Sequence, residues 1–238
     1  MGVVMIDASE RARLTARGCE PTEPEPSYHV VRKFLSQTQC EDLITGYTDD
    51  DAFRSRISMQ RHQFGRGEYS YFRYPLPALV ESARTRLYPL LVPWANRIAS
   101  ALNESISYPP THGEFVAQCH RAGQTKPTAL VLRYGVGDYN RLHRDLYGDT
   151  VFPIQGTVLL SDEADFDGGE FVLVENRPRQ QSIATVVSLQ RGDLVLFPVC
   201  DRPVPGVRRT LRATLRHGVS EVTRGSRWTL GLIFHDAA

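Results

Sequence analysis

Short runs of apolar and β-branched residues fill the second half of the chain, and Gly, Pro and Asp residues separate them. Runs of this length and composition predict strands, since helices need longer stretches with a period of 3.6 residues. The expected strands span residues 128–134, 152–161, 170–174, 194–198, 213–219 and 228–234. Such a series is typical of a double-sheet jelly roll. We therefore expect an α+β protein with a double-stranded β-helix (jelly roll) core over about residues 126–236.

Longer amphipathic patterns in the first half predict helices that support this sheet. Apolar residues at helical spacing predict a helix over residues 76–102, which Pro89 and Pro93 should kink or split. The other expected elements are a helix capped by Ser36 over 36–47, a helix over 109–122, strands over 28–35 and 52–59, and a loop or hairpin over 61–74. The loop or hairpin is rich in glycine and aromatic residues, and it either borders a site or simply packs.

The chain is expected to form one domain behind a short appendage. Residues 7–17 read as a helix and residues 20–26 (EPTEPEP) as a Pro-rich linker, so residues 1–27 could be a lid, a dimer arm or a plain surface helix. A chain of 238 residues fits one domain, and we assign residues 28–238 to it.

Composition narrows the classes of partner. The net charge is +1, which provides no overall field to attract nucleic acid. There is no apolar run of about 18 residues and no signal-peptide pattern, so we expect a cytoplasmic protein that does not span a membrane. Four cysteines lie scattered without the CxxC spacing, which favours free thiols in a reducing compartment. The sequence leaves the oligomeric state open.

The chemistry centres on the segment YGVGDYNRLHRD at residues 134–145. On an extended strand His143 and Asp145 project to the same face. A second imidazole, His217, follows in the expected strand over 213–219. Two histidines and one carboxylate form the facial triad of non-haem Fe(II) oxygenases, which leaves three coordination positions open. Zinc could occupy the same ligands.

Several motifs in fixed order around these ligands resemble the Fe(II)/2-oxoglutarate dioxygenase superfamily, in its prolyl-hydroxylase-like branch. They are Tyr134-x-x-Gly137-x-Tyr139, His143-x-Asp145, DGGE at 167–170, GDLVLF at 192–197, HGV at 217–219 and Gly225-x-Arg227-x-Thr229. Further segments, at 64–77, 122–135, 138–149, 168–182 and 229–237, are similar to a bacterial oxygenase family described as acting in oxidative repair of damaged DNA. That family commonly has Gln between the His and the Asp, where this chain has Arg144.

The resemblance implies Fe(II), 2-oxoglutarate as co-substrate, and O2. It makes His143, Asp145 and His217 the iron ligands and favours Fe(II) over zinc. Arg227 would hold the distal carboxylate of 2-oxoglutarate, because a guanidinium is a permanently charged fork for carboxylates. Thr229 shares the face of Arg227 and could donate its hydroxyl, and Tyr134 resembles the tyrosine that also contacts this co-substrate.

The residues that would contact the substrate are less well defined. The candidates flank the iron ligands: Tyr139, Asn140, Arg144 and Tyr147. On a regular strand Asn140 and Arg144 would face away from His143. An Arg-rich loop is expected at 202–216, where it either binds an anionic substrate or is a solvated loop. His112 and His120 lie in a predicted helix away from the motif, and we expect structural or surface roles for them.

Three substrate classes remain open. The first is a small molecule, such as an amino acid, that is oxidised at a C–H bond while 2-oxoglutarate gives succinate and CO2. The second is alkylated DNA or RNA, where hydroxylation of an N-alkyl group releases an aldehyde. The third is a protein side chain, as in prolyl hydroxylases. A binding domain with an inactive site is a fourth reading, which the complete ligand set disfavours.

Overall fold

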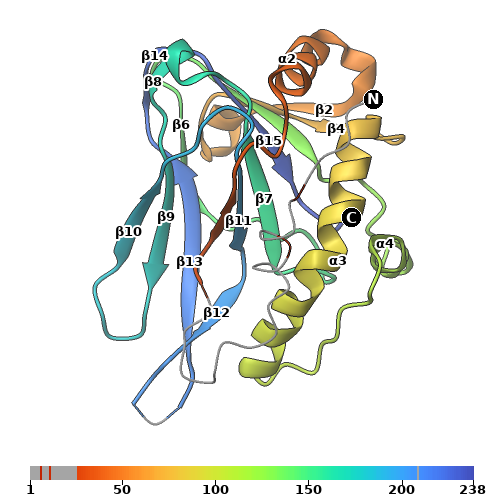
Figure 1. Cartoon of the computed structure of the whole chain (residues 1–238), viewed down its shortest axis with the longest axis vertical. Coiled ribbons are helices and arrows are strands. Elements are labelled where there is room, and N and C mark those ends of the chain that lie inside the picture. Colours follow the sequence, from red (N-terminus) through yellow and green to blue (C-terminus); the bar gives the residue numbers. More distant parts are fainter. Residues whose placement is uncertain (1–5, 7–10, 12–25, 208) are drawn as a thin grey trace.

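Two antiparallel β-sheets face each other, and the helices cover the outer side of the larger sheet (Figure 1). The computed structural model describes Ile6, Arg11 and residues 26–207 and 209–238. Most of the expected appendage over 1–27 therefore lies outside the described residues. The arrangement confirms the predicted α+β jelly roll with supporting helices.

The strand order places the central motif strands side by side. The larger sheet runs β1-β11-β7-β15-β5-β4-β2, the smaller sheet runs β10-β9-β13-β6-β3 with β12 beside β13, and β14 pairs with β8. The larger sheet consists of β1 (His29–Val31), β11 (Leu194–Pro198), β7 (Ile154–Leu159), β15 (Arg227–Leu232), β5 (Leu130–Tyr134), β4 (Glu68–Phe72) and β2 (Phe53–Ser58). The others are β10 (Ile183–Val187), β9 (Phe171–Asn176), β13 (Leu211–Val219), β6 (Tyr139–His143), β3 (Gly65–Arg66), β12 (Asp201–Val204), β14 (Val222–Gly225) and β8 (Phe166–Gly168).

Helix α2 (Gln37–Thr45) and helix α4 (His112–Arg121) begin where capping residues predict. The Ser36 side chain accepts from the Gln39 amide, and Thr111 and Glu114 form the corresponding capping box of α4. The expected helix over 109–122 thus starts later, because the cap is Thr111 and the two prolines precede it. Short 3-10 turns at Gly46–Thr48, Asp50–Ala52, Met59–His62 and Glu163–Asp165 complete the helical elements of the described residues.

Helix α3 (Ala78–Ala101) runs without a break through both prolines, so of the two expected outcomes, a kink or a split, the split is wrong. Pro89 is exposed and Pro93 is half-buried, on the face opposite the buried residues of this helix. Thr85, four residues before Pro89, is also exposed, so water can bond the carbonyl that lacks an amide partner. The cost of each proline is therefore small enough for packing to offset.

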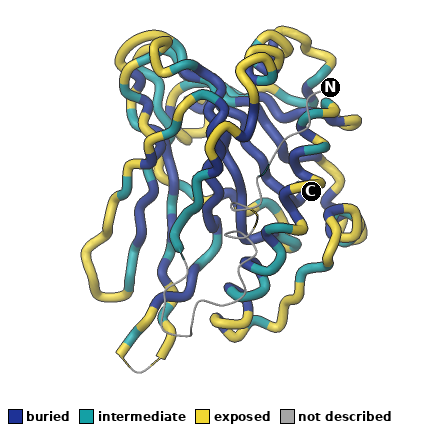
Figure 2. Tube along the Cα trace, in the orientation of Figure 1, coloured by how far each residue is buried: buried dark blue, intermediate teal, exposed yellow. Residues whose placement is uncertain are grey.

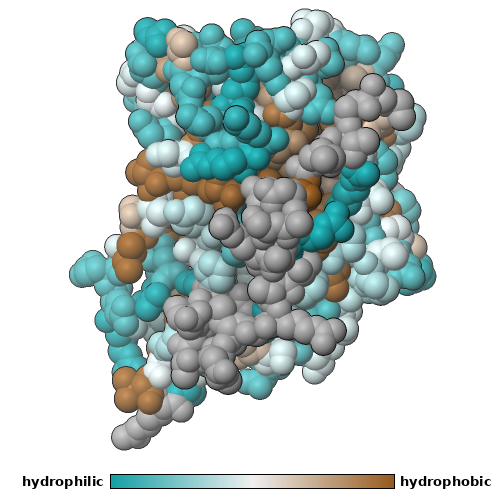
Figure 3. Space-filling model, viewed as in Figure 1, coloured by the Kyte–Doolittle hydropathy of each residue, from teal (hydrophilic) through white to brown (hydrophobic). Residues whose placement is uncertain are grey.

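The core has two layers, one between the sheets and one under the helices (Figure 2). Strand β11 contributes to both: Leu194 and Leu196 pack towards α3, whereas Val195 and Phe197 pack between the sheets. A strand buried on both faces carries a continuous apolar run, which explains the sequence LVLF. Among the coloured residues of Figure 3 hydrophilic ones predominate, and a hydrophobic band crosses the middle of this face.

Several expected boundaries need correction. Residues 202–216 do not form a loop, because β12 and β13 pair across this segment as a hairpin. Charged residues alternate with apolar ones along β13, and the sheet exposes only one of its faces there. The segment 61–74 forms β3 and β4, with β4 in the larger sheet, and β8, β10 and β14 are further strands that the apolar pattern missed. The strand expected to carry both His143 and Asp145 is β6, and it ends at His143. The first strand is shorter than expected, at His29–Val31. No helix in the described part of the chain has the length and apolarity to cross a membrane.

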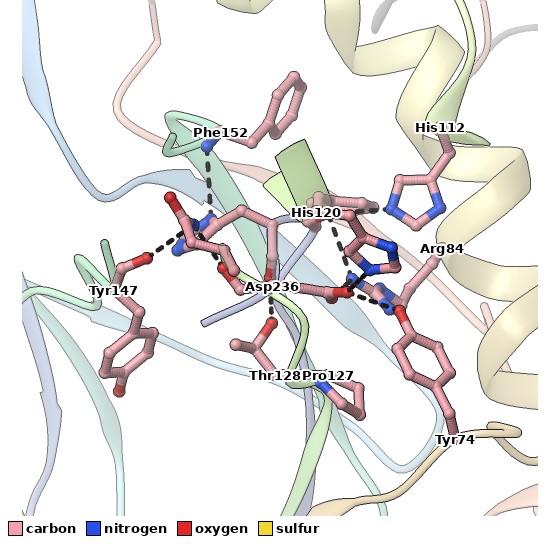
Figure 4. Close-up of polar contacts among 12 residues, drawn as sticks. Tyr74, Arg84, His112, His120, Pro127, Thr128, Tyr147, Phe152 and Asp236 are labelled. Atoms are coloured by element: carbon pink, nitrogen blue, oxygen red, sulfur yellow. Dashed lines mark hydrogen bonds and ion pairs between the residues drawn. The ribbon is translucent and has the colours of Figure 1, made fainter. Parts of the chain in front are cut away.

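A buried ionic cluster joins the end of the larger sheet to the helices (Figure 4). Asp236 and Arg84 are fully buried, and Arg84 Nη2 lies 3.1 Å from Asp236 Oδ1. The other carboxylate oxygen accepts from the Tyr74 hydroxyl at 2.8 Å and lies 3.0 Å from Nε2 of His120. His112 Nε2 donates to the Phe234 carbonyl at 2.9 Å. Both histidines therefore have structural contacts, as we expected.

Asp236→Ala is expected to destabilise the protein by about 3–5 kcal/mol, because it leaves the Arg84 guanidinium buried without a counter-charge. Chemical denaturation of the variant and the parent protein measures this difference. Asp50→Ala is the matched control, since Asp50 pairs with Arg56 on the surface at 3.0 Å and its side chain is 90% exposed. An exposed pair contributes about 0–1 kcal/mol, so equal losses in the two variants would contradict the role of burial.

Candidate functional site

A bulge in β6 brings the motif residues onto one wall. In the antiparallel pair β6–β13, His143 lies opposite His217 and Asn140 lies opposite Val219. Arg141 and Leu142 of β6 thus lie opposite the single residue Gly218 of β13, which is the two-against-one pattern of a β-bulge. The extra residue turns Asn140 to the same side as His143, and Asn140 Nδ2 donates to the hydroxyl of the buried Tyr134, another residue of the cavity lining, at 3.4 Å. The expectation that Asn140 faces away, which assumed a regular strand, is therefore wrong.

The three expected metal ligands converge. The potential ligand atoms of His143, Asp145 and His217 all lie within 4.8 Å of one another. Asp145 Oδ1 lies 3.5 Å from Nε2 of His143, and Oδ2 lies 3.4 Å from Nε2 of His217. His143 is fixed through Nδ1, which donates to the Arg141 carbonyl at 2.7 Å and leaves Nε2 for a metal. This is a set of two imidazoles and one carboxylate that could hold Fe(II).

The electrostatics keep Asp145 ready to bind a cation. Burial favours the neutral acid, but the hydrogen bonds and charges of His143 and His217 outweigh burial and hold the pKa of Asp145 well below its usual value. Two further side chains donate to this carboxylate: the Tyr147 hydroxyl to Oδ1 at 2.7 Å and Gln155 Nε2 to Oδ2 at 2.9 Å. The carboxylate is therefore ionised and held at both oxygens.

One amide anchors the segment that carries Asp145. Gln124, just after α4, has its Nε2 at 3.1 Å from the Tyr147 carbonyl, 3.0 Å from the Thr150 carbonyl and 2.5 Å from the Asp236 carbonyl. Its Oε1 accepts from the Thr150 amide at 2.7 Å. The irregular segment after β6 is thus tied both to α4 and to the chain just beyond β15.

Arg227 is a buried cation with free donors. It is 2% exposed, and its Nε and Nη1 have no hydrogen-bond partner among the described residues. Burial lowers its pKa to about 10, which leaves it charged at neutral pH. Its guanidinium lies 5.8 Å from the centre of the Tyr134 ring, and Thr229 lies on the same face of β15. A buried guanidinium without a counter-ion fits a missing carboxylate ligand.

A cavity of about 390 Å³ lies beside the metal-ligand candidates, and Arg227 itself is not among the described residues that line it. Tyr134, Asn140 and Thr229 line it together with the three metal-ligand candidates. Tyr69, Tyr71 and Tyr147 form an aromatic wall, with rings 5.4 Å apart for the first pair and 6.4 Å apart for the second. The cavity can therefore hold a small polar acid near β15 and an organic group near the aromatic wall.

The remaining substrate candidates lie in different places. Arg144 and Tyr147 line the cavity, but the Arg144 guanidinium lies 3.3 Å from Asp201, and the Tyr147 hydroxyl is bound to Asp145. Tyr139 begins β6 and is not among the described residues that line the cavity. Sequence reasoning missed Gln155, Tyr69 and Tyr71. For Gln155 the signal was available, since it is an amide inside an apolar strand.

Comparison with known proteins agrees with this geometry. Residues 67–237 match the model of a family, Oxygenase-NA, described as oxygenases catalysing oxidative methylation of damaged DNA. The chain belongs to this oxygenase family. An uncharacterized protein of Mycobacterium tuberculosis (strain H37Rv) is 46% identical to the oxygenase over 170 residues, which cover 71% of this chain and 73% of that protein. A PKHD-type hydroxylase of Pseudomonas putida is 31% identical over 152 residues, 60% of this chain and 53% of the hydroxylase.

Solved structures show the same fold. A prolyl-4-hydroxylase of Pseudomonas putida matches 89% of the oxygenase and 93% of its own chain, with a TM-score of 0.51 and 15% identity. A prolyl hydroxylase of Trichoplax adhaerens was solved in complex with a peptide of hypoxia inducible factor. The match covers 87% of the oxygenase and 82% of the prolyl hydroxylase chain, with a TM-score of 0.53 and 12% identity. With the family match and the His-Asp-His set, the protein is a 2-oxoglutarate-dependent non-haem Fe(II) dioxygenase that uses Fe(II), 2-oxoglutarate and O2.

Proposed function

We propose that His143, Asp145 and His217 hold the iron and that Arg227, with Tyr134 and Thr229, holds 2-oxoglutarate. The free Nε and Nη1 of Arg227 support this role, because a carboxylate of the co-substrate would supply their acceptors. Bound iron, 2-oxoglutarate and O2 supply the oxidising chemistry. The residues around them orient the two organic molecules and exclude water.

We further propose that the substrate is a small molecule, such as an amino acid, oxidised at a C–H bond. In the balanced reaction one oxygen atom of O2 enters succinate and the other enters the product, while CO2 leaves. The cavity volume carries this proposal: about 390 Å³ is near the lower end of the range for small-ligand sites, about 300–1,000 Å³, and it must also hold 2-oxoglutarate. The aromatic wall of Tyr69, Tyr71 and Tyr147 would contact the substrate body.

A second candidate, oxidative dealkylation of damaged DNA or RNA, has specific support. The family description names damaged DNA. The exposed Phe64 lines the cavity, and the exposed His62 stacks on it with ring centres 5.4 Å apart. The exposed Arg61 and Arg66 flank these two residues in the sequence. Aromatic rings beside cationic side chains are the usual means of holding single strands. This reading requires an alkylated base to enter a cavity of limited size.

A succinate-release assay separates these candidates. Amino acids and related small acids, alkylated single-stranded oligonucleotides and a proline-containing peptide are compared at the same enzyme, Fe(II) and 2-oxoglutarate concentrations. We expect release above the uncoupled background with a small molecule, and none from Asp145→Ala. Release and aldehyde formation only with oligonucleotides, reduced in Phe64→Ala, would replace the first proposal by the second. Release only with the peptide would favour the protein side-chain class.

A further inference from the structure

Gln155 is a buried amide at the centre of the site. It lies in β7, where every residue is buried, and is 4% exposed. Its Nε2 lies 2.9 Å from Asp145 Oδ2 and 3.3 Å from Nε2 of His217. Because an ionised carboxylate only accepts hydrogen bonds, the nitrogen end of the amide must face Asp145. Its Oε1 has no partner among the described residues, so the two nitrogen contacts orient the side chain.

The two acceptors of Gln155 behave differently when a metal binds. The carboxylate of Asp145 has several lone pairs and can bind a metal while still accepting a hydrogen bond. Nε2 of His217 has one lone pair, which cannot serve both a metal and an amide N–H. Metal binding therefore removes one acceptor of Gln155 and leaves one N–H of its amide free beside the ligands.

We propose that Gln155 is a positioning residue that keeps Asp145 oriented and turns its second N–H to the keto-acid end of 2-oxoglutarate. The keto-acid end carries oxygen acceptors, and Gln155 lines the same cavity as the ligand set and as Tyr134 and Thr229, two of the proposed co-substrate contacts. Arg227 would fix the distal carboxylate, and Gln155 would fix the opposite end. This inference rests on the proposed iron site but is independent of which substrate is oxidised.

Tyr147 provides the matched comparison. Its hydroxyl donates to Oδ1 of the same carboxylate at 2.7 Å, and burial and the charge of Asp145 raise its pKa, so it stays a donor at neutral pH. No hydrogen bond joins Tyr147 to His217 among the described residues. Tyr147→Phe thus removes one hydrogen bond to Asp145 and leaves the N–H groups of Gln155 in place.

The test titrates Fe(II), and then 2-oxoglutarate, into the full-length wild type, Gln155→Leu, Gln155→Met and Tyr147→Phe without oxygen. All three variants are expected to weaken Fe(II) binding by about 10- to 100-fold, as for other partners of metal ligands. At saturating Fe(II), only the Gln155 variants should bind 2-oxoglutarate about tenfold more weakly, the loss of about one hydrogen bond. They should also move the visible charge-transfer band to higher energy, because a hydrogen bond to the keto acid lowers its accepting orbital.

The outcomes separate this inference from the proposed function. If a folded Gln155 variant, verified by circular dichroism, keeps the band position and 2-oxoglutarate affinity of the wild type, the inference is wrong. The same holds if Tyr147→Phe produces equal changes, because these would then follow from Asp145 alone. If the wild type itself gives no band that depends on His217, the proposed iron site fails first. The Met variant matches the length of Gln, so cavity formation does not explain its result.

Discussion

His217→Ala is expected to give no charge-transfer band with Fe(II) and 2-oxoglutarate and to lose turnover by at least 10³-fold, roughly the scale for a group acting on the reacting atoms. The reason is that only two of the three proposed metal ligands remain. The lost ligand, His217, is buried, with 7% of its surface exposed. Anaerobic absorption and succinate release measure the two effects. His143→Ala is expected to behave in the same way.

The control for this loss is another histidine near the cavity mouth. His62 is exposed and stacks on Phe64, and it is not part of the ligand set. His62→Ala is expected to keep the Fe(II) affinity and the band of the wild type. Full activity in His143→Ala or His217→Ala would remove the assignment of the metal site.

Arg227→Leu is expected to have opposite effects on stability and on co-substrate binding. A buried guanidinium without a counter-charge destabilises the ligand-free fold, so its replacement by a leucine should raise the melting temperature without 2-oxoglutarate. The variant should need about 10- to 100-fold more 2-oxoglutarate, because a charge-assisted hydrogen bond contributes about 1.5–3 kcal/mol. Thermal unfolding with and without 2-oxoglutarate, together with KM for 2-oxoglutarate, measures both.

Arg133→Leu serves as the comparison, since Arg133 is next to Tyr134 on the same strand but points outward to Glu68 at 3.5 Å. It should change neither the KM for 2-oxoglutarate nor the stabilisation that the co-substrate provides. An Arg227→Leu variant that is less stable than wild type without ligand, yet unchanged in KM, would show that Arg227 only packs.

The sequence predicted the chemistry of the site more accurately than it predicted the local backbone geometry. The ligand atoms of His143, Asp145 and His217 do converge, although β6 ends at His143 and Asp145 lies in the irregular segment after it, so the strand alternation assumed from the sequence is not what brings Asp145 to the site. Asn140 was placed on the wrong side because a bulge shifts alternation by one residue, and nothing in the letters NRL marks where the extra residue lies. The continuity of α3 depended on which face Pro89 and Pro93 occupy, which packing decides.

The roles of the residues that contact the metal-ligand candidates were harder to predict from the sequence, for a different reason. Tyr147 suggested a substrate contact because it follows the motif, but the segment after β6 folds its hydroxyl back onto Asp145. Gln124 acts through contacts with residues far apart in the chain, of which local patterns carry no trace, whereas the amide of Gln155 inside an apolar strand was a signal that the sequence offered. The Arg-rich hairpin over 202–216 shows the converse, since a high charge density concealed two strands.

The anchor formed by Gln124 has a consequence for the order of events during synthesis. Both His143 and Asp145 leave the ribosome well before Asp236, whose carbonyl lies 2.5 Å from the Gln124 amide that also holds the segment after β6. Until residues 233–236 have been made and β15 has paired between β5 and β7, Arg227 has no place in the sheet and this anchor is incomplete. The nascent chain therefore presents metal-binding side chains before it can retain and shield an oxidising centre, and productive loading with iron should follow translation.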